Sequence, residues 1–317
     1  MRYRRLGRSG LKVSEVALGG WFNEGVKHDE WMLNQLLGEA LERGVNLIDL
    51  ADIYGSGETE ALYGRLLKDY PRHQLVLSSK CFWPMSEGVN DCGLSRKHLM
   101  ESVHGSLKRL QTDYLDIFLC HAEDLETPLE ETVRAIADLI RQGKILYWGI
   151  CGWQAQRVFD VVNLCAELNA PQPINHQLVY NLLERHPERV HLKHSAELGL
   201  GVTAWSPLAG GILARNGRRR NASDKSMRSL ELMSSLWRVD ELSSYHADKV
   251  LAIFEGLARE ASMTRAQLAI SWVLRRQEIA SVILGVSSIE QLQDNLAVLE
   301  LNVPTEILNQ LDQLFTF

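Results

Sequence analysis

Four side chains suited to acid–base chemistry stand at or near the ends of short apolar segments. Asp49 closes VNLID, Lys80 closes LVLSSK and His121 closes LDIFLCH. Tyr54 follows Asp49 by five residues, in the loop ADIYGSGE. In a barrel of parallel strands the carboxyl ends of all strands meet at one face, where active sites form. We therefore predict that a carboxylate, a phenol, a cation and an imidazole converge at that face.

Proton transfer is the chemistry that a tyrosine beside a lysine favours. The pKa of a free tyrosine is near 10, but a cation about 4 Å away at an effective dielectric constant near 20 contributes roughly 4 kcal/mol, or about three pKa units. Lys80 is thus expected to lower the pKa of Tyr54, although desolvation opposes part of the shift. A phenol tuned in this way can serve as an acid near neutral pH.

Ordinary roles compete with this interpretation for each residue taken alone. An aspartate at a strand end is often a helix cap, a lysine is usually solvated, and a histidine is often only hydrogen-bonded. The occurrence of all four in register is much less expected by chance. A further alternative makes Lys80 the nucleophile of a Schiff-base enzyme, but Asp49 beside it would keep the amine protonated and unreactive.

Composition limits the classes of protein to which the chain can belong. Its 317 residues, 45% of them hydrophobic, suffice for one domain with a large core, and we predict a single domain over residues 1–317. A net charge of −6 argues against nucleic-acid binding, and no apolar segment is long enough for membrane insertion. Five cysteines without CxxC or paired-histidine spacing favour reduced thiols in a cytoplasmic protein, with no disulfide and no metal such as zinc.

The order of apolar segments predicts an α/β fold, a (β/α)8 TIM barrel. Eight strand-like segments alternate with helical patterns, and about 250 residues is typical of this barrel. Residues Tyr3–Leu6 and Leu11–Val13 flank GRSG and predict an N-terminal hairpin, while Thr305–Leu314 predict an extra C-terminal helix. Pro207–Ser244 contain no clear strand and are interpreted as one long loop. The helices are expected near 29–42, 58–67, 95–110, 128–142, from 154, 190–198, 245–260, 264–275 and 289–299.

Two segments could bind a phosphate, and neither is a dinucleotide fingerprint of the usual glycine-rich type. Gly285 follows the last strand, and Ser287 and Ser288 open a helix, where unpaired N–H groups and the helix dipole favour an anion. Ser288 could equally be a helix cap paired with Gln291. The loop ARNGRRRNASDKSMR gathers arginines that could clamp a phosphate or simply be solvated.

Several motifs in order resemble the aldo-keto reductase superfamily, from about Leu6 to Leu299. They are NLIDLADIYGSGETEALYGRLL, SSK, YLDIFLCH, LIRQGKILYWGICGW, AWSPLAGGIL and SVILGVSSIEQLQDN. The segments GLSRKHLMESVHGSLKRLQTDYLD and TPLEETVRAIADLIRQGK resemble the branch that contains potassium-channel β subunits. The chain departs from many relatives in having Cys151 and Gly152 where a Ser–Asn pair is usual, and Asp294 where Glu is usual.

The resemblance implies a barrel that binds NADPH or NADP and reduces the carbonyl group of a small-molecule aldehyde or ketone to an alcohol. Tyr54 would be the general acid, Asp49 and Lys80 would tune it, and His121 would orient the carbonyl. It also implies a set of cofactor-binding residues. They are Gly20, Trp21, Asp49, Cys151, Gly152, Gln177, Trp205, Ser206, Pro207, Leu208, Gly210, Arg228, Gly285, Ser287, Gln291, Asp294 and Asn295.

Substrate and assembly are less defined by the sequence. Trp21, Trp83 and Trp153 are expected on strand-end loops, where they either line a substrate pocket with Tyr54 and His121 or pack the rim of the barrel. The alternative function implied by the resemblance is a nicotinamide-binding sensor or regulatory subunit with little turnover. Such subunits commonly lack the histidine, so His121 favours an enzyme. A homo-oligomer is compatible with the sequence.

Overall fold

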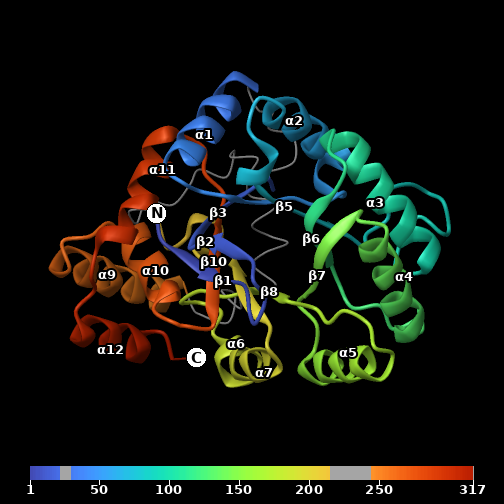
Figure 1. The fold of residues 1–317 in the computed structure, drawn as a ribbon. Coiled ribbons are helices and arrows are strands. Elements are labelled where there is room, and N and C mark those ends of the chain that lie inside the picture. Colours follow the sequence, from blue (N-terminus) through green and yellow to red (C-terminus); the bar gives the residue numbers. More distant parts are fainter. Residues whose placement is uncertain (22–29, 215–243, 317) are drawn as a thin grey trace.

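Eight parallel strands close into a barrel, which is drawn in Figure 1. The computed structural model describes residues 1–21, 30–214 and 244–316 of the chain. Around the barrel the strand order is β10-β3-β4-β5-β6-β7-β8-β9, and each strand is parallel to its neighbours. The strands are β3 (Val16–Gly19), β4 (Leu47–Asp49), β5 (Val76–Cys81), β6 (Leu115–Cys120), β7 (Ile145–Cys151), β8 (Asn175–Val179), β9 (Gly201–Trp205) and β10 (Ile279–Leu284).

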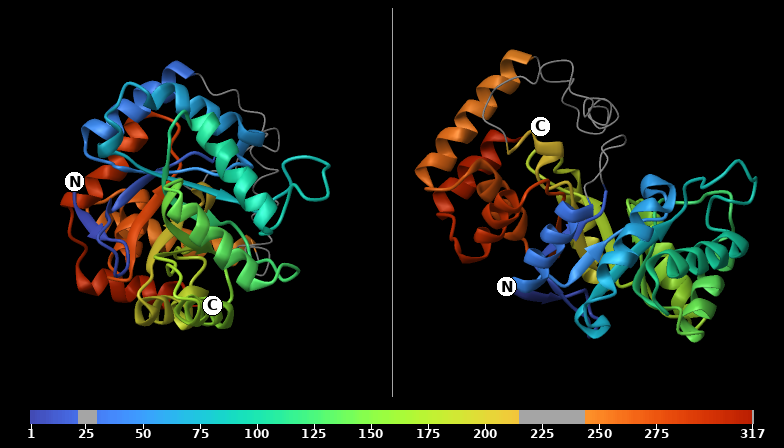
Figure 2. Two further views of the ribbon diagram at one scale, coloured as in Figure 1. Left: turned by 45° about the vertical axis from the view of Figure 1, so that its right-hand side comes forward. Right: turned by 90° about the horizontal axis from the view of Figure 1, so that it is seen from above.

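Helices surround the strands, as the two views of Figure 2 also show. They are α1 (Glu30–Glu42), α2 (Glu58–Leu67), α3 (Arg96–Leu110), α4 (Leu129–Arg141), α5 (Ala155–Glu167), α6 (His186–Arg189), α7 (His191–Leu198), α9 (Ser244–Glu260), α10 (Arg265–Leu274), α11 (Ile289–Leu296) and α12 (Thr305–Leu314). Short 3-10 turns are η1 (Tyr54–Gly57), η2 (Arg72–Gln74), η3 (Ala209–Gly211) and η5 (Ala297–Glu300). Among the described residues, no helix combines the length and apolarity needed to cross a bilayer.

The strands are buried on both faces because both faces are covered. All six residues of β6 are buried. Ile117 and Leu119 pack inside the barrel, whereas Phe118 and Cys120 pack in the layer between strands and helices. Successive side chains of a strand point to opposite faces. Each strand therefore supplies one row of side chains to the barrel interior and another to the helix-facing layer.

A two-stranded hairpin covers the end of the barrel where the strands begin. β1 (Tyr3–Arg5) pairs antiparallel with β2 (Lys12–Ser14). Leu6 and Val13 are fully buried and belong to the same apolar cluster as the first residues of β4 and β5. The hairpin thus seals the amino-terminal end and leaves the carboxyl-terminal end as the open face, where the chemistry of such barrels occurs.

The predicted barrel with its N-terminal hairpin is confirmed, and most predicted helices begin and end within a residue or two of the observed ones. α3 begins at Arg96 because Ser95 caps it, its Oγ accepting the His98 N–H at 3.3 Å. The helix predicted over 289–299 was too long, since α11 ends at Leu296 and the chain tightens into η5. Most of the predicted long loop lies outside the described residues.

We expect Gly64→Ala to destabilise the fold because α2 and α3 approach closely at Gly64. An added Cβ would lie 2.3 Å from Arg109 O and 2.8 Å from Leu110 C, both backbone atoms of α3. Such overpacking lowers the free energy of unfolding by about 1–3 kcal/mol. The control is Gly256→Ala in α9, where the added Cβ meets nothing within 4 Å. It should stabilise the protein by up to about 1 kcal/mol. Urea unfolding of both variants checks the prediction, and equal stabilities would contradict it.

Candidate active site

Lys80 is the centre of a buried polar network at the carboxyl ends of β4 and β5. Its ammonium Nζ donates to Asp49 Oδ2 at 2.7 Å, to Leu50 O at 2.7 Å and to the Tyr54 hydroxyl at 3.3 Å. Lys80 is fully buried, and Asp49 is 4% exposed. The convergence expected from the sequence therefore occurs, and it takes the form of a chain of contacts from carboxylate to ammonium to phenol.

Asp49 is held by two further side chains that orient its carboxylate. Ser78 Oγ donates to Asp49 Oδ1 at 3.1 Å, and Gln177 Nε2 donates to the same oxygen at 3.0 Å. Sequence reasoning missed Ser78 and gave Gln177 a different role. A signal for Ser78 was available, because it lies two residues before Lys80 on the same face of a strand. It is also in register with Asp49 across the β4–β5 pair.

The expected lowering of the Tyr54 pKa is wrong in this structure. Burial raises the pKa of Tyr54 to about 12, although the Lys80 charge and its hydrogen bond act in the opposite direction. Desolvation penalises the phenolate more than one lysine stabilises it, since the Asp49 carboxylate also favours the neutral phenol. Tyr54 is consequently a protonated donor across the neutral range. For Lys80, burial favours the neutral amine, but Asp49 and Tyr54 prevail and raise its pKa. A charged ammonium disfavours the Schiff-base alternative.

His121 directly follows β6 and faces Tyr54. The two ring centroids lie 6.0 Å apart with the planes nearly perpendicular. Burial, assisted by the Lys80 charge, lowers the pKa of His121 to about 3, so the imidazole is neutral at neutral pH. Within the described part of the chain, Nδ1 of His121 is buried and makes no hydrogen bond. A neutral imidazole has one N–H donor, which is suited to a polar oxygen of a substrate.

The three predicted pocket tryptophans have different environments. Trp83 is 45% exposed, and its ring stands 6.5 Å from that of His121. Trp21, which follows the end of β3, is 42% exposed. Trp153 is only 1% exposed and belongs to the layer between strands and helices. For Trp153 the packing interpretation fits this structure, whereas Trp83 and Trp21 have ring surface available for a ligand.

The predicted cofactor residues follow the ends of strands that are neighbours in the barrel. Register pairs join Cys151 to Gln177, Val179 to Trp205, and Trp205 to Ile283. The ends of β7, β8, β9 and β10 therefore form one continuous arc, which leads on to Gly20 and Trp21 after β3. Along this arc lie Cys151, Gly152, Gln177, Trp205, Ser206, Pro207, Leu208, Gly210, Gly285 and Ser287.

Two glycines on this arc border open space. A Cβ added at Gly152 or at Gly285 would meet nothing within 4 Å. The backbone after β9 turns sharply, with positive φ at Ser206 (51°) and Gly210 (61°). The Gln177 amide is already engaged, because Nε2 donates to Asp49 and Oε1 lies 3.9 Å from the Cys151 thiol. The open glycine positions and the strand-end arc fit a dinucleotide, and Gln177 would contact it only as part of the Asp49 network.

The start of α11 has the helix cap that was one of the two interpretations offered for it. Ser288 Oγ caps the helix by accepting the Gln291 N–H at 3.2 Å. Gln291 Oε1 in turn accepts the N–H of Ser287 at 3.1 Å. Thr264 and Gln267 donate to the Asp294 carboxylate at 2.9 and 2.8 Å.

The cap and these bonds fix α11 against α10. Asn295 is buried in the same helix, with 4% of its surface exposed. The anion site predicted at this helix start stays a prediction. Arg228 and the other arginines of its loop from 215 onward lie outside the described residues.

Comparisons with known proteins agree with this architecture. The model of a family described as the Aldo/keto reductase family matches residues 15–315. A probable voltage-gated potassium channel subunit beta of Oryza sativa subsp. japonica is 38% identical over 306 residues, which cover 95% of this chain and 92% of the relative. A protein of the same description in Arabidopsis thaliana is 37% identical with the same coverage.

We expect the lowered pKa of His121 to make stability fall in acid. An ordinary histidine has a pKa near 6.5, so below that pH the unfolded chain binds a proton that the folded site rejects down to about pH 3. The stabilisation is thus present above pH 6.5 and is lost as the pH falls. His121→Asn should flatten the dependence of the unfolding free energy on pH between 6.5 and 4, by a difference on the order of 1–3 kcal/mol.

Urea unfolding at several pH values measures this difference. His176, which is also buried with a pKa lowered to about 3, is common to both proteins and cancels in the comparison. Parallel pH curves for wild type and variant would show that His121 is not the group responsible.

Proposed function

Because the chain belongs to the aldo/keto reductase family, we propose that it is an NADPH-dependent oxidoreductase that reduces aldehyde or ketone carbonyls to alcohols. The observation that carries the proposal is the buried chain of contacts Asp49–Lys80–Tyr54, with Lys80 Nζ 2.7 Å from the carboxylate and 3.3 Å from the phenol. A neutral imidazole stands beside this phenol. These groups are suited to protonating an oxygen that gains negative charge.

Tyr54 is the proton donor in this mechanism. With its pKa at about 12, the phenol is fully protonated at neutral pH when a substrate arrives, and it regains a proton after each turnover. As the carbonyl oxygen becomes an alkoxide, its basicity exceeds that of a phenolate, and the proton moves to it. The phenolate left behind lies 3.3 Å from a fixed ammonium. Lys80 therefore stabilises charge that develops only during the reaction, which is the condition for lowering a barrier.

Asp49 is a positioning residue in this scheme. Its carboxylate keeps Lys80 charged in a site that would otherwise expel the charge. Ser78 and Gln177 fix the carboxylate on its other oxygen, so the ammonium has one preferred place. His121 would donate its single N–H to the carbonyl oxygen and so orient it toward the Tyr54 hydroxyl.

The cofactor would lie along the arc of strand ends from β7 to β10. A nicotinamide dinucleotide, when bound, supplies hydride to the carbonyl carbon, and the protein supplies placement and electrostatics. Trp205 would stack on the nicotinamide, and the segment Ser206–Gly210 would follow the pyrophosphate. Ser287, Gln291 and Asn295 would hold the adenosine end at the start of α11. The exposed rings of Trp21 and Trp83 favour apolar or aromatic carbonyl substrates.

A second candidate function rests on the printed names of the two plant relatives. Both are described as probable potassium channel β subunits, so this chain would bind a nicotinamide cofactor and regulate a partner with little turnover of its own. His121 and the intact Asp49–Lys80–Tyr54 contacts favour turnover instead. The two functions differ in turnover. An enzyme oxidises many cofactor molecules per protein molecule, whereas a regulatory subunit oxidises few.

A screen of NADPH oxidation separates these functions. Purified protein is mixed with NADPH and a panel of aldehydes, ketones and quinones, with NADH in parallel. We expect sustained oxidation of many equivalents of NADPH for each active site with at least one carbonyl class. Oxidation that stops at one equivalent, with tight retention of the product cofactor, would support the regulatory alternative and contradict the proposal.

We expect Tyr54→Phe to lose carbonyl reduction while it retains cofactor affinity. The variant removes the proton donor but keeps the ring, and general acid catalysis is worth about 10²–10⁴-fold in rate. The control is Tyr147→Phe in β7, a tyrosine outside the Lys80 network. Steady-state kinetics and fluorescence titration with NADPH measure the two properties. Most of the wild-type kcat remaining in Tyr54→Phe would remove Tyr54 from this role.

We expect the protein to bind NADPH about a hundredfold or more tightly than NADH. NADPH has one phosphate that NADH lacks, and two charged hydrogen bonds to it would contribute about 1.5–3 kcal/mol each. Ser287 and the arginine loop are the predicted donors. Ser287→Ala, Arg228→Ala and Arg218/Arg219/Arg220→Ala should each weaken the binding of NADPH more than that of NADH. Dissociation constants for both cofactors test this. Equal affinity of the wild type for both cofactors would contradict the phosphate interpretation.

A further inference from the structure

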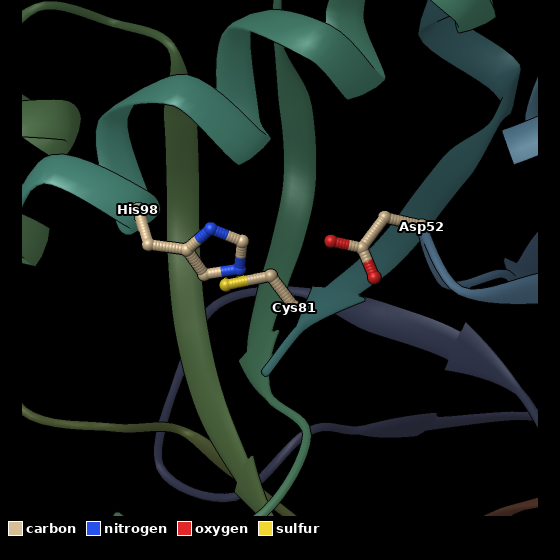
Figure 3. Close-up of side chains that lie close together, drawn as sticks. All are labelled: Asp52, Cys81 and His98. Atoms are coloured by element: carbon tan, nitrogen blue, oxygen red, sulfur yellow. The ribbon is translucent and has the colours of Figure 1, made fainter. Parts of the chain in front are cut away.

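A second cluster of chemically active side chains lies on the opposite side of β5 from the active site. Asp52 lies in the loop between β4 and η1, Cys81 is the last residue of β5, and His98 is in the first turn of α3. Figure 3 shows the Cys81 side chain between Asp52 and His98, with its sulfur directed toward the His98 ring. One potential ligand atom from each residue lies within 4.8 Å of the other two.

The polar atoms of this cluster are buried and incompletely paired. Asp52 and Cys81 are fully buried, and His98 is 1% exposed. Within the described residues, Asp52 Oδ1 and both ring nitrogens of His98 make no hydrogen bond. An unsatisfied buried polar group costs about 1–3 kcal/mol, more if it is charged. A ligand bound between these side chains would give the unpaired Asp52 oxygen and a His98 ring nitrogen a partner.

We propose that Asp52, Cys81 and His98 form a binding site for a divalent transition-metal ion, with Zn²⁺ as the best match. Carboxylate oxygen, thiolate sulfur and imidazole nitrogen are the donors that Zn²⁺ takes in proteins. In a tetrahedral zinc site such donors lie roughly 3.3–3.6 Å apart, as follows from metal–ligand distances of about 2.0–2.3 Å. The ligand atoms lie within 4.8 Å of one another, so each pair must approach by about 1.5 Å at most to reach this geometry.

Neighbouring side chains stand where outer partners of a metal site are usually found. Asp91 Oδ1 lies 3.5 Å from His98 Nδ1, which leaves Nε2 of the ring for the metal. Ser102 Oγ donates to Asp52 Oδ2 at 2.8 Å and leaves Oδ1 for the metal. A carboxylate behind a ligating histidine fixes the tautomer and strengthens the ligand. The site thus has three candidate ligands. Asp91 orients His98, and Ser102 orients Asp52.

The absence of a zinc motif in the sequence does not count against this site. Asp52, Cys81 and His98 are separated by 29 and 17 residues, so no short spacing reveals them. All five cysteines are free thiols, which leaves the Cys81 sulfur available. The Asp52 N–H donates to Lys80 O at 3.1 Å, and Tyr54 follows two residues later. A metal bound here would link the loop after β4, which carries Asp52 and Tyr54, to β5 and α3 and so stabilise their relative positions.

Metal analysis of the full-length protein tests the proposal. The chain is unfolded with chelator and refolded with ZnCl₂ or with CoCl₂, because the ligands are buried. We expect one Zn²⁺ per chain by elemental analysis, and for Co²⁺ the absorption of a tetrahedral thiolate complex. Cys81→Ser and His98→Gln should each bind at least a hundredfold more weakly. The matched controls are Cys165→Ser, a buried thiol in α5, and His104→Gln, an exposed histidine in α3. They should bind like the wild type.

Further measurements keep the test decisive if a ligand variant does not fold. Asp91→Ala removes only the partner of His98 and should weaken Co²⁺ binding by about 10–100-fold. X-ray absorption of the wild-type zinc protein should show one sulfur among nitrogen and oxygen neighbours. Wild-type protein that refolds fully without retaining Zn²⁺ or Co²⁺, or a bound metal without a sulfur neighbour, would overturn the proposal. The cluster would then be a hydrogen-bonded polar group only.

Discussion

The buried ion pair between Lys80 and Asp49 is the interaction on which the open face of the barrel depends. A charge without a partner at this depth would be strongly destabilising, and removing one member of a buried pair typically costs about 3–5 kcal/mol. The structure meets this requirement with several hydrogen bonds instead of a single contact. Leu50 O accepts from the ammonium, while Ser78 and Gln177 donate to the carboxylate. Because these groups come from β4, β5 and β8, the ion pair also links opposite parts of the barrel.

The same pair explains where the phenol lies, whereas burial is the main reason that the pKa of Tyr54 is high. Tyr54 reaches the ammonium from the loop after β4, and its half-buried ring lies beside the fully buried Lys80. Exclusion of water strengthens every charge–charge interaction within the site, but it also penalises a phenolate before any substrate is present. A donor that stays protonated and a cation already fixed beside it form a preorganised arrangement. The Lys80 charge then affects the reaction mainly through the charge that appears when the proton leaves.

The fold could be predicted from the sequence because its signals are local and repeated. Each of the eight strands appears as a short apolar segment followed by a helical pattern, and α2 and α12 were bounded to the residue by such patterns. The full set of hydrogen bonds around Asp49 could not be predicted from the sequence. Gln177 lies 128 residues away from Asp49, and only closure of the barrel brings it there. The pKa of Tyr54 also depends on how deeply the side chain is buried, and this cannot be inferred from the spacing of residues in the sequence.

Alternation along β5 connects the two sites of this protein. Ser78 and Lys80 point into the barrel and hold Asp49, whereas Leu77 and Cys81 point toward the helices. The loop after β4 behaves in the same way, since Asp52 turns outward to Ser102 of α3 while Tyr54 turns inward to Lys80. A movement of α3 would therefore displace Asp52, and through it Tyr54, which follows two residues later in the chain. Whatever fixes the outer cluster, whether a metal or hydrogen bonds alone, also limits how far the phenol can depart from the ammonium.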